Sequence, residues 1–295
     1  MEIKEFSEVI KKELEERTGN EVRIQKVTKN NGVVLHGVNI MKPGTNVLPT
    51  LYLEPMLENY NNGESNEEVV EQLLTILKRE ERASNLDMSW FRDFENVKGK
   101  IAYKLVNYEA NRELLEKVPH TRYLDLAKTY YAPVVIDEFK TGNIPIYSTH
   151  LELWGITKEQ LERFGEENTP KLFPADIMSM SKALGNLLGQ ESDEALEAEK
   201  MTNMYIITNT ERHFGAAVMC YAEVLKQFAE QKNSDLIIIP SSLHEIIILT
   251  QTIVDDMKQL HEMLEEVNRT QLSPDEVLSD NVYIYSREQG AVLMA

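Results

Sequence analysis

The stretch that most constrains this chain is Asp235–Thr250, which reads DLIIIPSSLHEIIILT. Two short apolar runs, Leu236–Ile239 and Ile246–Leu249, flank a Pro-Ser-Ser turn signal. Each run is too short for a helix and is rich in β-branched isoleucine, which predicts two strands. Because neither run alternates with polar residues, we expect both faces of each strand to be covered, as in the centre of a sheet that carries packed helices.

The composition is that of a globular protein with a sizeable core. Of the 295 residues, 42% are hydrophobic and 27% are charged, a balance that separates the chain from disordered proteins. The formal net charge is −18. Because so acidic a surface repels the phosphates of nucleic acids and of anionic membranes, we expect neither as a direct partner. A protein with a basic surface is compatible with this charge.

The cysteine count and the N-terminal sequence bear on the cellular compartment. Cys220 is the only cysteine, so the chain forms neither an intramolecular disulfide nor a cysteine-based zinc site. The N-terminal sequence MEIKEFSEVIKKELEE is highly charged and lacks the apolar segment of a signal peptide. No stretch reaches the ~20 apolar residues of a membrane-spanning helix. These features predict a soluble, cytoplasmic protein.

Hydrophobic periodicity, polar caps and Gly or Pro breaks predict the order of helices and strands. The predicted helices cover residues 3–17, 66–82, 108–118, 157–168, 178–188 and 253–267, with a short aromatic helix or turn at 90–94 and a further cap at 273–276. The predicted strands cover residues 22–27, 33–40, 47–53, 101–106, 123–137, 144–154, 204–208, 236–239, 246–249 and 282–285. In the last long helix, residues 253, 257, 260, 264 and 267 are expected to face inward.

These elements predict an α+β fold. A small N-terminal region of helix plus antiparallel sheet is followed by a larger mixed, mostly antiparallel sheet packed by helices. We expect one unit over residues 1–295, with a possible sub-domain seam near 190–200. The reason for placing a seam there is the segment Gln190–Lys200, which holds five acidic residues and reads as a solvated helical face or an acidic linker.

Several sequence strings carry a family resemblance. They are Lys29-Asn-Asn-Gly32, Val118-Pro-His-Thr-Arg-Tyr-Leu-Asp-Leu-Ala127, His150-Leu-Glu-Leu-Trp-Gly-Ile156, Pro240-Ser-Ser-Leu-His-Glu245 and Leu278-Ser-Asp280. With these strings the chain resembles a bacterial family of uncharacterised proteins, a domain of unknown function common in gut anaerobes and often associated with mobile elements. The resemblance spans nearly the whole chain and implies one structural unit and a bacterial cytosolic origin. It carries over no catalytic residue.

Histidines supply the main candidate for chemistry. The sequence has no phosphate loop, dinucleotide fingerprint, nucleophile elbow, HExxH motif or EF-hand loop. His150 and Glu152 share one face of a predicted strand, and with His244 they could ligate a divalent metal, which His120 could join. Such a site predicts a metal-dependent hydrolase and fails if the side chains lie more than ~10 Å apart. Alternatively, each histidine satisfies a local backbone or carboxylate bond.

Two other reactive side chains favour structural interpretations. Ser241 and Ser242 lie near His244, but turn chemistry explains the Pro-Ser-Ser sequence without a nucleophile. Cys220 lies in the apolar segment Ala216–Tyr221 and is expected to be a buried, inert thiol.

The leading functional hypothesis is a non-enzymatic interaction protein, without a cofactor, whose acidic surface binds a protein with a basic surface. As a passenger of mobile elements it would modulate a host or defence protein, and its acidity would permit mimicry of a nucleic-acid backbone. Clustering of Asp and Glu on one face would support this idea, and even scatter would count against it. The alternatives are the metal-dependent hydrolase and a small-ligand sensor with an apolar pocket between sheet and helices.

Overall fold

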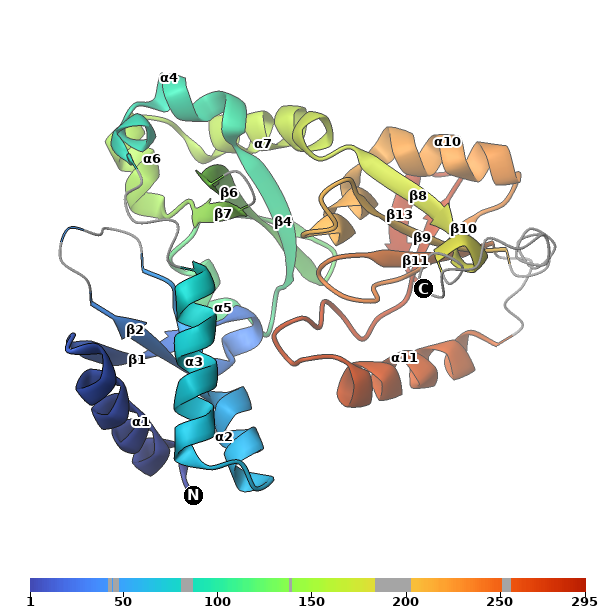
Figure 1. Ribbon diagram of the computed structural model, residues 1–295. Coiled ribbons are helices and arrows are strands. Elements are labelled where there is room, and N and C mark those ends of the chain that lie inside the picture. The colour runs from blue at the N-terminus through green and yellow to red at the C-terminus, as the bar shows by residue number, and fades with distance from the viewer. Residues whose placement is uncertain (42–43, 45–47, 81–86, 138–139, 184–202, 251–255) are drawn as a thin grey trace. The chain divides into compact units, whose positions relative to one another are not determined.

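The computed structural model describes residues 1–41, 44, 48–80, 87–137, 140–183, 203–250 and 256–295 (Figure 1). The fold is α+β, as predicted. The contacts group into two compact units. Unit 1 comprises Met1–Trp90 and Val134–Gly142, and unit 2 comprises Phe91–Pro133 and Asn143–Ala295. The seam predicted near 190–200 lies outside the described residues, and a single unit over 1–295 stays a prediction.

Unit 1 is a small antiparallel sheet with helices. Its elements are α1 (Ile3–Thr18), β1 (Val22–Thr28), η1 (Asn30–Gly32), β2 (Val34–Ile40), β3 (Leu51–Tyr52), α2 (Leu53–Asn61) and α3 (Asn66–Glu80). The strand order is β1-β2-β3. Phe6, Ile10 and Leu14 of α1 are fully buried in one core with residues of β2 and α3.

Local sequence signals explain most of unit 1. Helix α1 ends at Gly19, whose φ of 67° is the left-handed conformation of a C-terminal cap. The β1–β2 hairpin turns at Asn30-Asn-Gly32, where Asn31 also has a positive φ of 58°. At the start of α3, the Ser65 backbone N–H donates to the Glu68 carboxylate at 2.8 Å and the Glu68 N–H donates to the Ser65 hydroxyl at 3.3 Å, which together form a capping box. Helix α2 was not predicted.

Unit 2 contains two sheets and most of the remaining helices. Its first part has α4 (Phe94–Val97), η3 (Lys98–Lys100), β4 (Ala102–Asn107), α5 (Arg112–Leu115), β5 (His120–Tyr123), β6 (Leu126–Asp137), β7 (Lys140–Pro145), α6 (Ser148–Trp154) and α7 (Lys158–Leu172), preceded by η2 (Ser89–Arg92). The end of β6 from Val134 onward and the start of β7 up to Gly142 belong to unit 1. The second part has β8 (Ala175–Ser179), β9 (Met204–Asn209), η4 (Gly215–Cys220), α10 (Ala222–Lys232), β10 (Leu236–Ile239), β11 (Ile246–Thr250), α11 (Met257–Gln271), β12 (Tyr283–Ser286) and β13 (Ala291–Met294).

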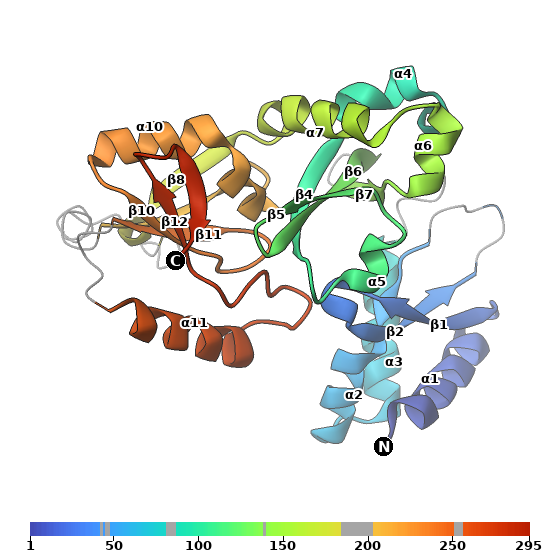
Figure 2. The same ribbon diagram turned by 180° about the vertical axis from the view of Figure 1, so that it is seen from behind.

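The isoleucine-rich strands form the centre of a six-stranded sheet, as predicted. Its order is β13-β12-β10-β11-β9-β8, and every pairing is antiparallel. On one face, Leu260 and Leu264 of α11 pack on Ile237. On the other face, the Phe228 ring of α10 lies 5.0 Å from the Tyr205 ring. Figures 1 and 2 show α10 and α11 on opposite faces, which explains why both strands are apolar throughout.

The second sheet of unit 2 has the order β4-β6-β5, and β7 pairs with β6. Helix α7 packs on this sheet through a glycine. A Cβ at Gly165 would lie 2.8 Å from the Tyr130 ring, so only glycine allows this approach. One turn later, the Thr169 hydroxyl accepts the Tyr103 backbone N–H at 3.1 Å. In the described chain, no helix is both long and apolar enough to cross a bilayer.

One predicted element is wrong in type, and another begins too early. The strand predicted over 144–154 ends at Pro145, and residues 148–154 form helix α6 instead. The helix begins there because His150 Nδ1 accepts the Tyr147 backbone N–H at 3.0 Å, a cap that the apparent alternation concealed. The helix predicted over 178–188 begins too early, since Met178 lies in β8 and pairs with Ile206 of β9. Its residues from 184 onward lie outside the described chain.

Three further boundaries differ from prediction. The predicted helix 108–118 is reduced to α5. The long strand begins at Leu126 because a turn with Leu124 at φ 57° separates β5 from β6. The cap predicted at Ser273 opens no helix, and the Glu276 N–H closes a turn onto the Ser273 carbonyl at 2.8 Å.

Candidate functional site

The predicted ligands His150 and Glu152 lie in helix α6, not on a strand. Residues i and i+2 of a helix point about 200° apart, so these side chains do not share a face. The His150 ring packs against Phe91 and Trp154, with centroid distances of 5.1 and 5.6 Å. Burial lowers the pKa of His150. Its Nδ1 caps the helix, which is a local structural role.

The third predicted ligand, His244, lies between β10 and β11. Its Nδ1 accepts the Phe214 backbone N–H at 3.3 Å, and its Nε2 lies 3.9 Å from the Glu276 carboxylate. Its ring centroid is 5.2 Å from that of His213. Among the residues with described positions, no group of three His, Cys, Asp or Glu could hold a metal ion. A metal held by His150, Glu152 and His244 stays a prediction, which elemental analysis of the purified protein tests.

The other candidate groups also make local bonds. His120 Nδ1 lies 3.1 Å from the Val118 carbonyl. The Ser242 hydroxyl accepts the His244 backbone N–H at 3.0 Å, which is turn chemistry. Burial raises the pKa of the Cys220 thiol to about 12. The thiol therefore stays protonated at neutral pH and is a poor nucleophile.

Sequence reasoning missed the histidine that lies beside His244. His213 belongs to a segment with two left-handed non-glycine residues, Arg212 at φ 51° and Phe214 at φ 54°. The Asn209 side chain holds this segment, because its Nδ2 donates to the His213 carbonyl at 2.9 Å and its Oδ1 accepts the His213 N–H at 3.3 Å. Left-handed backbone outside glycine costs about 1 kcal/mol or more per residue and often marks functional segments.

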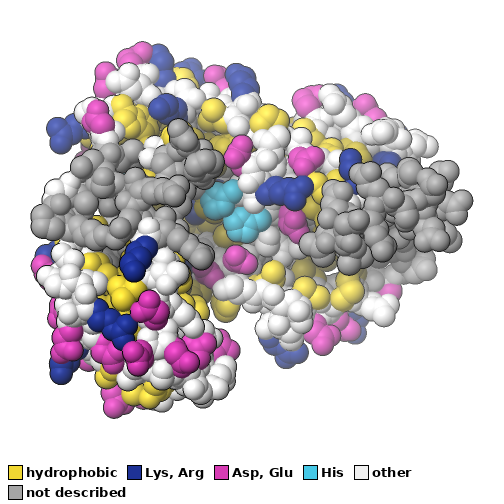
Figure 3. Space-filling view, viewed as in Figure 1, with side chains coloured by type: hydrophobic (Ala, Val, Ile, Leu, Met, Phe, Trp, Pro, Cys, Tyr) yellow, Lys and Arg dark blue, Asp and Glu magenta, His cyan; other side chains and the backbone are white. Residues whose placement is uncertain are grey.

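In each histidine of the pair, one ring nitrogen has a neighbouring N–H donor. His244 Nδ1 accepts a backbone N–H, and His213 Nε2 lies 3.0 Å from the Asn143 side-chain nitrogen, which donates to it. The pKa of His213 is lowered to about 4. The main cause is partial burial of the ring away from water, and the nearby His244 and Lys104 lower the pKa in the same direction. Figure 3 shows histidine side chains next to one another on one face of the molecule. Of the pair, His213 therefore takes up a proton only in acid.

A second unusual surface lies on helix α11. Met263 and Val267 form an apolar stripe at i and i+4, and their exposed fractions are 52% and 41%. Glu262 and Glu266, one residue earlier in each turn, form an acidic stripe beside it. We call these four residues the α11 face. The Glu262 carboxylate lies 3.4 Å from the ammonium of Lys258.

The α11 face differs from the sequence prediction. Val267 was predicted to face inward, but the inward position belongs to Asn268, which is only 5% exposed. Asn268 Nδ2 donates to the Ser279 carbonyl at 3.0 Å and to the Asp280 carboxylate at 2.8 Å. Because these bonds fix the rotation of the helix, Val267 is turned toward solvent.

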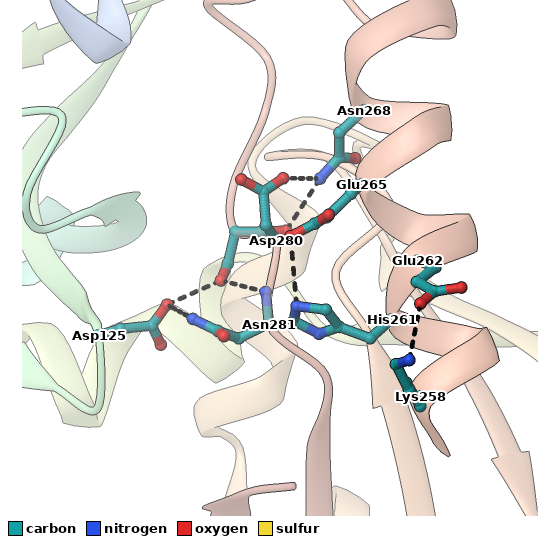
Figure 4. A network of polar contacts seen from close by, with 9 residues as sticks. Asp125, Lys258, His261, Glu262, Glu265, Asn268, Asp280 and Asn281 are labelled. Carbon is teal, nitrogen blue, oxygen red and sulfur yellow. Dashed lines mark hydrogen bonds and ion pairs between the residues drawn. The ribbon is translucent and has the colours of Figure 1, made fainter. Parts of the chain in front are cut away.

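The same polar network continues to Asp125 (Figure 4). The Asp125 carboxylate accepts bonds from the Ser279 hydroxyl at 2.7 Å, the Asn281 amide at 3.0 Å and the Tyr283 hydroxyl at 2.8 Å. Asp125 lies in the β5–β6 turn, so the network joins both sheets of unit 2 and α11. Hydrogen bonds to a charged acceptor are stronger than those between neutral groups. The network therefore holds α11, and with it the α11 face, in a fixed position.

Comparisons with known proteins add one finding. A family model described as a Family of unknown function (DUF5688) matches residues 3–287. No curated protein and no solved structure matches the chain.

Proposed function

This chain belongs to the Family of unknown function (DUF5688), and on that premise we propose that it is a non-enzymatic, cytoplasmic interaction module that binds a protein with a basic surface. The observation that carries the proposal is the α11 face. An apolar stripe with an acidic stripe alongside it is complementary to a surface that presents apolar side chains beside Lys or Arg.

The apolar stripe supplies the free energy of binding in this proposal. Full burial of one Met or Val side chain is worth about 1.5–3 kcal/mol, and about half of each side chain is still exposed. Met263 and Val267 together therefore contribute roughly 2 kcal/mol when a partner covers them. This amount supports a transient complex and requires further contacts for a tight one.

The acidic charge supplies selectivity and speed of association. A net charge of −18 attracts a basic partner over distances of about a Debye length, roughly 8 Å at physiological salt. The same charge opposes direct contact with nucleic acid or anionic membranes. On the face drawn in Figure 3, acidic and basic side chains are interspersed, which counts against recognition by acidic charge alone. The contact is therefore assigned to the α11 face, where an apolar stripe accompanies the acidic one.

The support behind the face favours binding without rearrangement. Asn268 is bonded to the loop that Asp125 also holds, so Met263 and Val267 are presented on a fixed helix. A preformed surface loses less conformational entropy on association than a mobile one.

A designed peptide tests the proposal. The probe is a helical peptide with Leu at i and i+4 and Lys at the flanking positions, titrated calorimetrically into the full chain at low and high salt. We expect binding that weakens with salt, and a further loss of roughly tenfold in Met263→Ser/Val267→Ser.

Charge controls separate the α11 face from general attraction. Glu262→Gln/Glu266→Gln changes the net charge by the same amount as Glu5→Gln/Glu8→Gln, which alters two exposed residues of α1. The first pair should weaken peptide binding about three- to tenfold, and the second pair much less. Equal losses in both pairs, or no binding by the wild type, would contradict the proposal.

A further inference from the structure

The strand at one end of the six-stranded sheet has an unusual composition for an edge. Strand β13, Ala291–Met294, reads AVLM and contains no charge and no proline. Native sheets protect exposed edges with charged residues, proline, bulges or very short strands. An unprotected edge is therefore a surface available for pairing with another strand.

The other edge strands whose positions are described all carry such protection. Strand β1 contains Arg23 and Lys26, β3 has only two residues, β4 contains Lys104, β5 contains Arg122, β7 contains Pro145, and β8 contains Asp176. Among these described edges, β13 alone has neither a charge nor a proline and is longer than two residues. The exception is consistent with a pairing function for this edge.

The hydrogen-bond register identifies which groups face outward. The Ala295 N–H donates to the Val282 carbonyl at 3.0 Å, so this pair is a hydrogen-bonded pair of the antiparallel ladder. Bonded and non-bonded pairs alternate, which makes Val292, opposite Tyr285, and Met294, opposite Tyr283, non-bonded positions. The backbone N–H and C=O groups of Val292 and Met294 therefore point away from β12, toward the open edge.

We propose that β13 accepts an extended segment of a basic protein partner, which adds a seventh strand to the sheet. The outward groups of Val292 and Met294 would give up to four backbone hydrogen bonds. The Met294 side chain, 48% exposed, would pack against the added strand. The net charge of −18 favours a basic occupant over a second copy of this chain, because two equally acidic chains repel one another.

The surface is distinct from the α11 face and rests on different observations. Only the basic character of the partner rests on the same net charge as the proposed function. The two surfaces can therefore be tested separately in one protein.

Amide hydrogen exchange on the full chain tests the proposal. The probe is a capped peptide of alternating Lys and Val, added in excess. We expect the amides of Val292 and Met294 to exchange at least threefold more slowly with the peptide, while the amides of Leu293 and Ala295, already bonded to β12, change little. No slowing at Val292 and Met294 would overturn the proposal.

Variants make the test specific. Val292→Pro removes an outward donor without removing a bond to β12, and Val292→Thr keeps that donor. Peptide binding should fall at least tenfold in the first variant and stay within twofold in the second. Should Val292→Pro perturb folding, Met294→Lys places a charge on the edge, with Val135→Lys as a matched exposed control.

The remaining outcomes distinguish this proposal from the others. Glu262→Gln/Glu266→Gln should leave binding of the strand peptide unchanged, so failure of the α11 face and failure of β13 are separate results. A concentration-dependent dimer, detected by light scattering and lost in Met294→Lys, would assign the edge to a second copy and overturn the partner named here.

Discussion

Helices α1 and α11 have nearly the same length, 16 and 15 residues, and both are amphipathic. Helix α1 is attached mainly by apolar contacts, with Phe6, Ile10 and Leu14 fully buried, and Glu15 adds a polar contact by accepting the Val22 backbone N–H at 3.1 Å. Helix α11 combines two buried leucines with a buried asparagine and leaves Met263 and Val267 exposed. The same periodicity therefore produces a purely structural helix in unit 1 and a helix with an available apolar stripe in unit 2.

The difference between α1 and α11 shows how one buried, hydrogen-bonded side chain changes which face of a helix is exposed. Hydrophobic burial is non-directional, so α1 rotates until its apolar side chains are covered. Hydrogen bonds are directional, so Asn268 sets the rotation of α11 even though apolar side chains stay in water. Exposed apolar groups on a fixed support are typical of binding surfaces.

The largest expected effect on stability comes from truncating Phe6, a buried side chain of α1. Phe6→Ala should lower the free energy of unfolding of unit 1 by about 3–5 kcal/mol, because it removes buried contacts and leaves a cavity. Urea unfolding followed by circular dichroism measures the change. A loss below about 1 kcal/mol would mean that α1 is not held mainly by burial.

The next effect concerns the network behind α11. Asp125→Ala should cost about 3 kcal/mol, because the buried Ser279 and Tyr283 hydroxyls lose a charged acceptor. We expect faster amide exchange in the loop before β12 and in α11 together. Unchanged amide exchange in α11 would mean that the Asp125 network does not stabilise this helix.

A substitution that improves the apolar pattern should nevertheless destabilise the protein. Asn268→Leu removes the bonds to Ser279 and Asp280, although it also removes the Asn268 Oδ1, which has no hydrogen-bond partner among the residues that the structure describes. We expect a net loss of about 1–2 kcal/mol in thermal or urea unfolding. A gain in stability would show that burial, and not the hydrogen bonds, sets the rotation of α11.

The polar contacts of unit 2 should also respond to pH. The pKa of His213 is lowered to about 4, whereas an unfolded histidine titrates near 6.5. Between these values the unfolded state binds more protons, so stability should fall as the pH decreases from about 6.5 to 4. Because His213 is exposed, its contribution should stay below about 1 kcal/mol.

Nuclear magnetic resonance titration measures this histidine directly. Unfolding of His213→Asn should depend less on pH across the same interval than unfolding of the wild type. A His213 that titrates near 6.5 in the folded protein would remove the basis for this prediction.

The smallest expected effect is on the exposed stripe. Met263→Ala and Val267→Ala should each change the free energy of unfolding by less than about 0.5 kcal/mol, as is usual for surface positions. This result would leave the stripe without a structural role and available for binding. A loss above about 1.5 kcal/mol in either variant would mean that the described chain already covers it.

Local patterns were sufficient where the determining contacts lie close in sequence. The capping box at Ser65, the left-handed cap at Gly19 and the paired isoleucine strands follow from residues a few positions apart, and each could be predicted. Pattern reasoning failed at 144–154, where polar and apolar residues alternate by chance. There the His150 cap favours a helix.

By itself, the sequence determined the fold class, the central strands and most helix positions, because these depend on hydrophobic periodicity and on local caps. Only the tertiary structure decided that His213 lies beside His244, that Asn268 turns Val267 outward and that β13 is an end strand of the described six-stranded sheet. Each of these facts depends on contacts between residues distant in sequence or on the order of strands. Periodicity within one element carries no information about such contacts, so they could not be predicted from the residues alone.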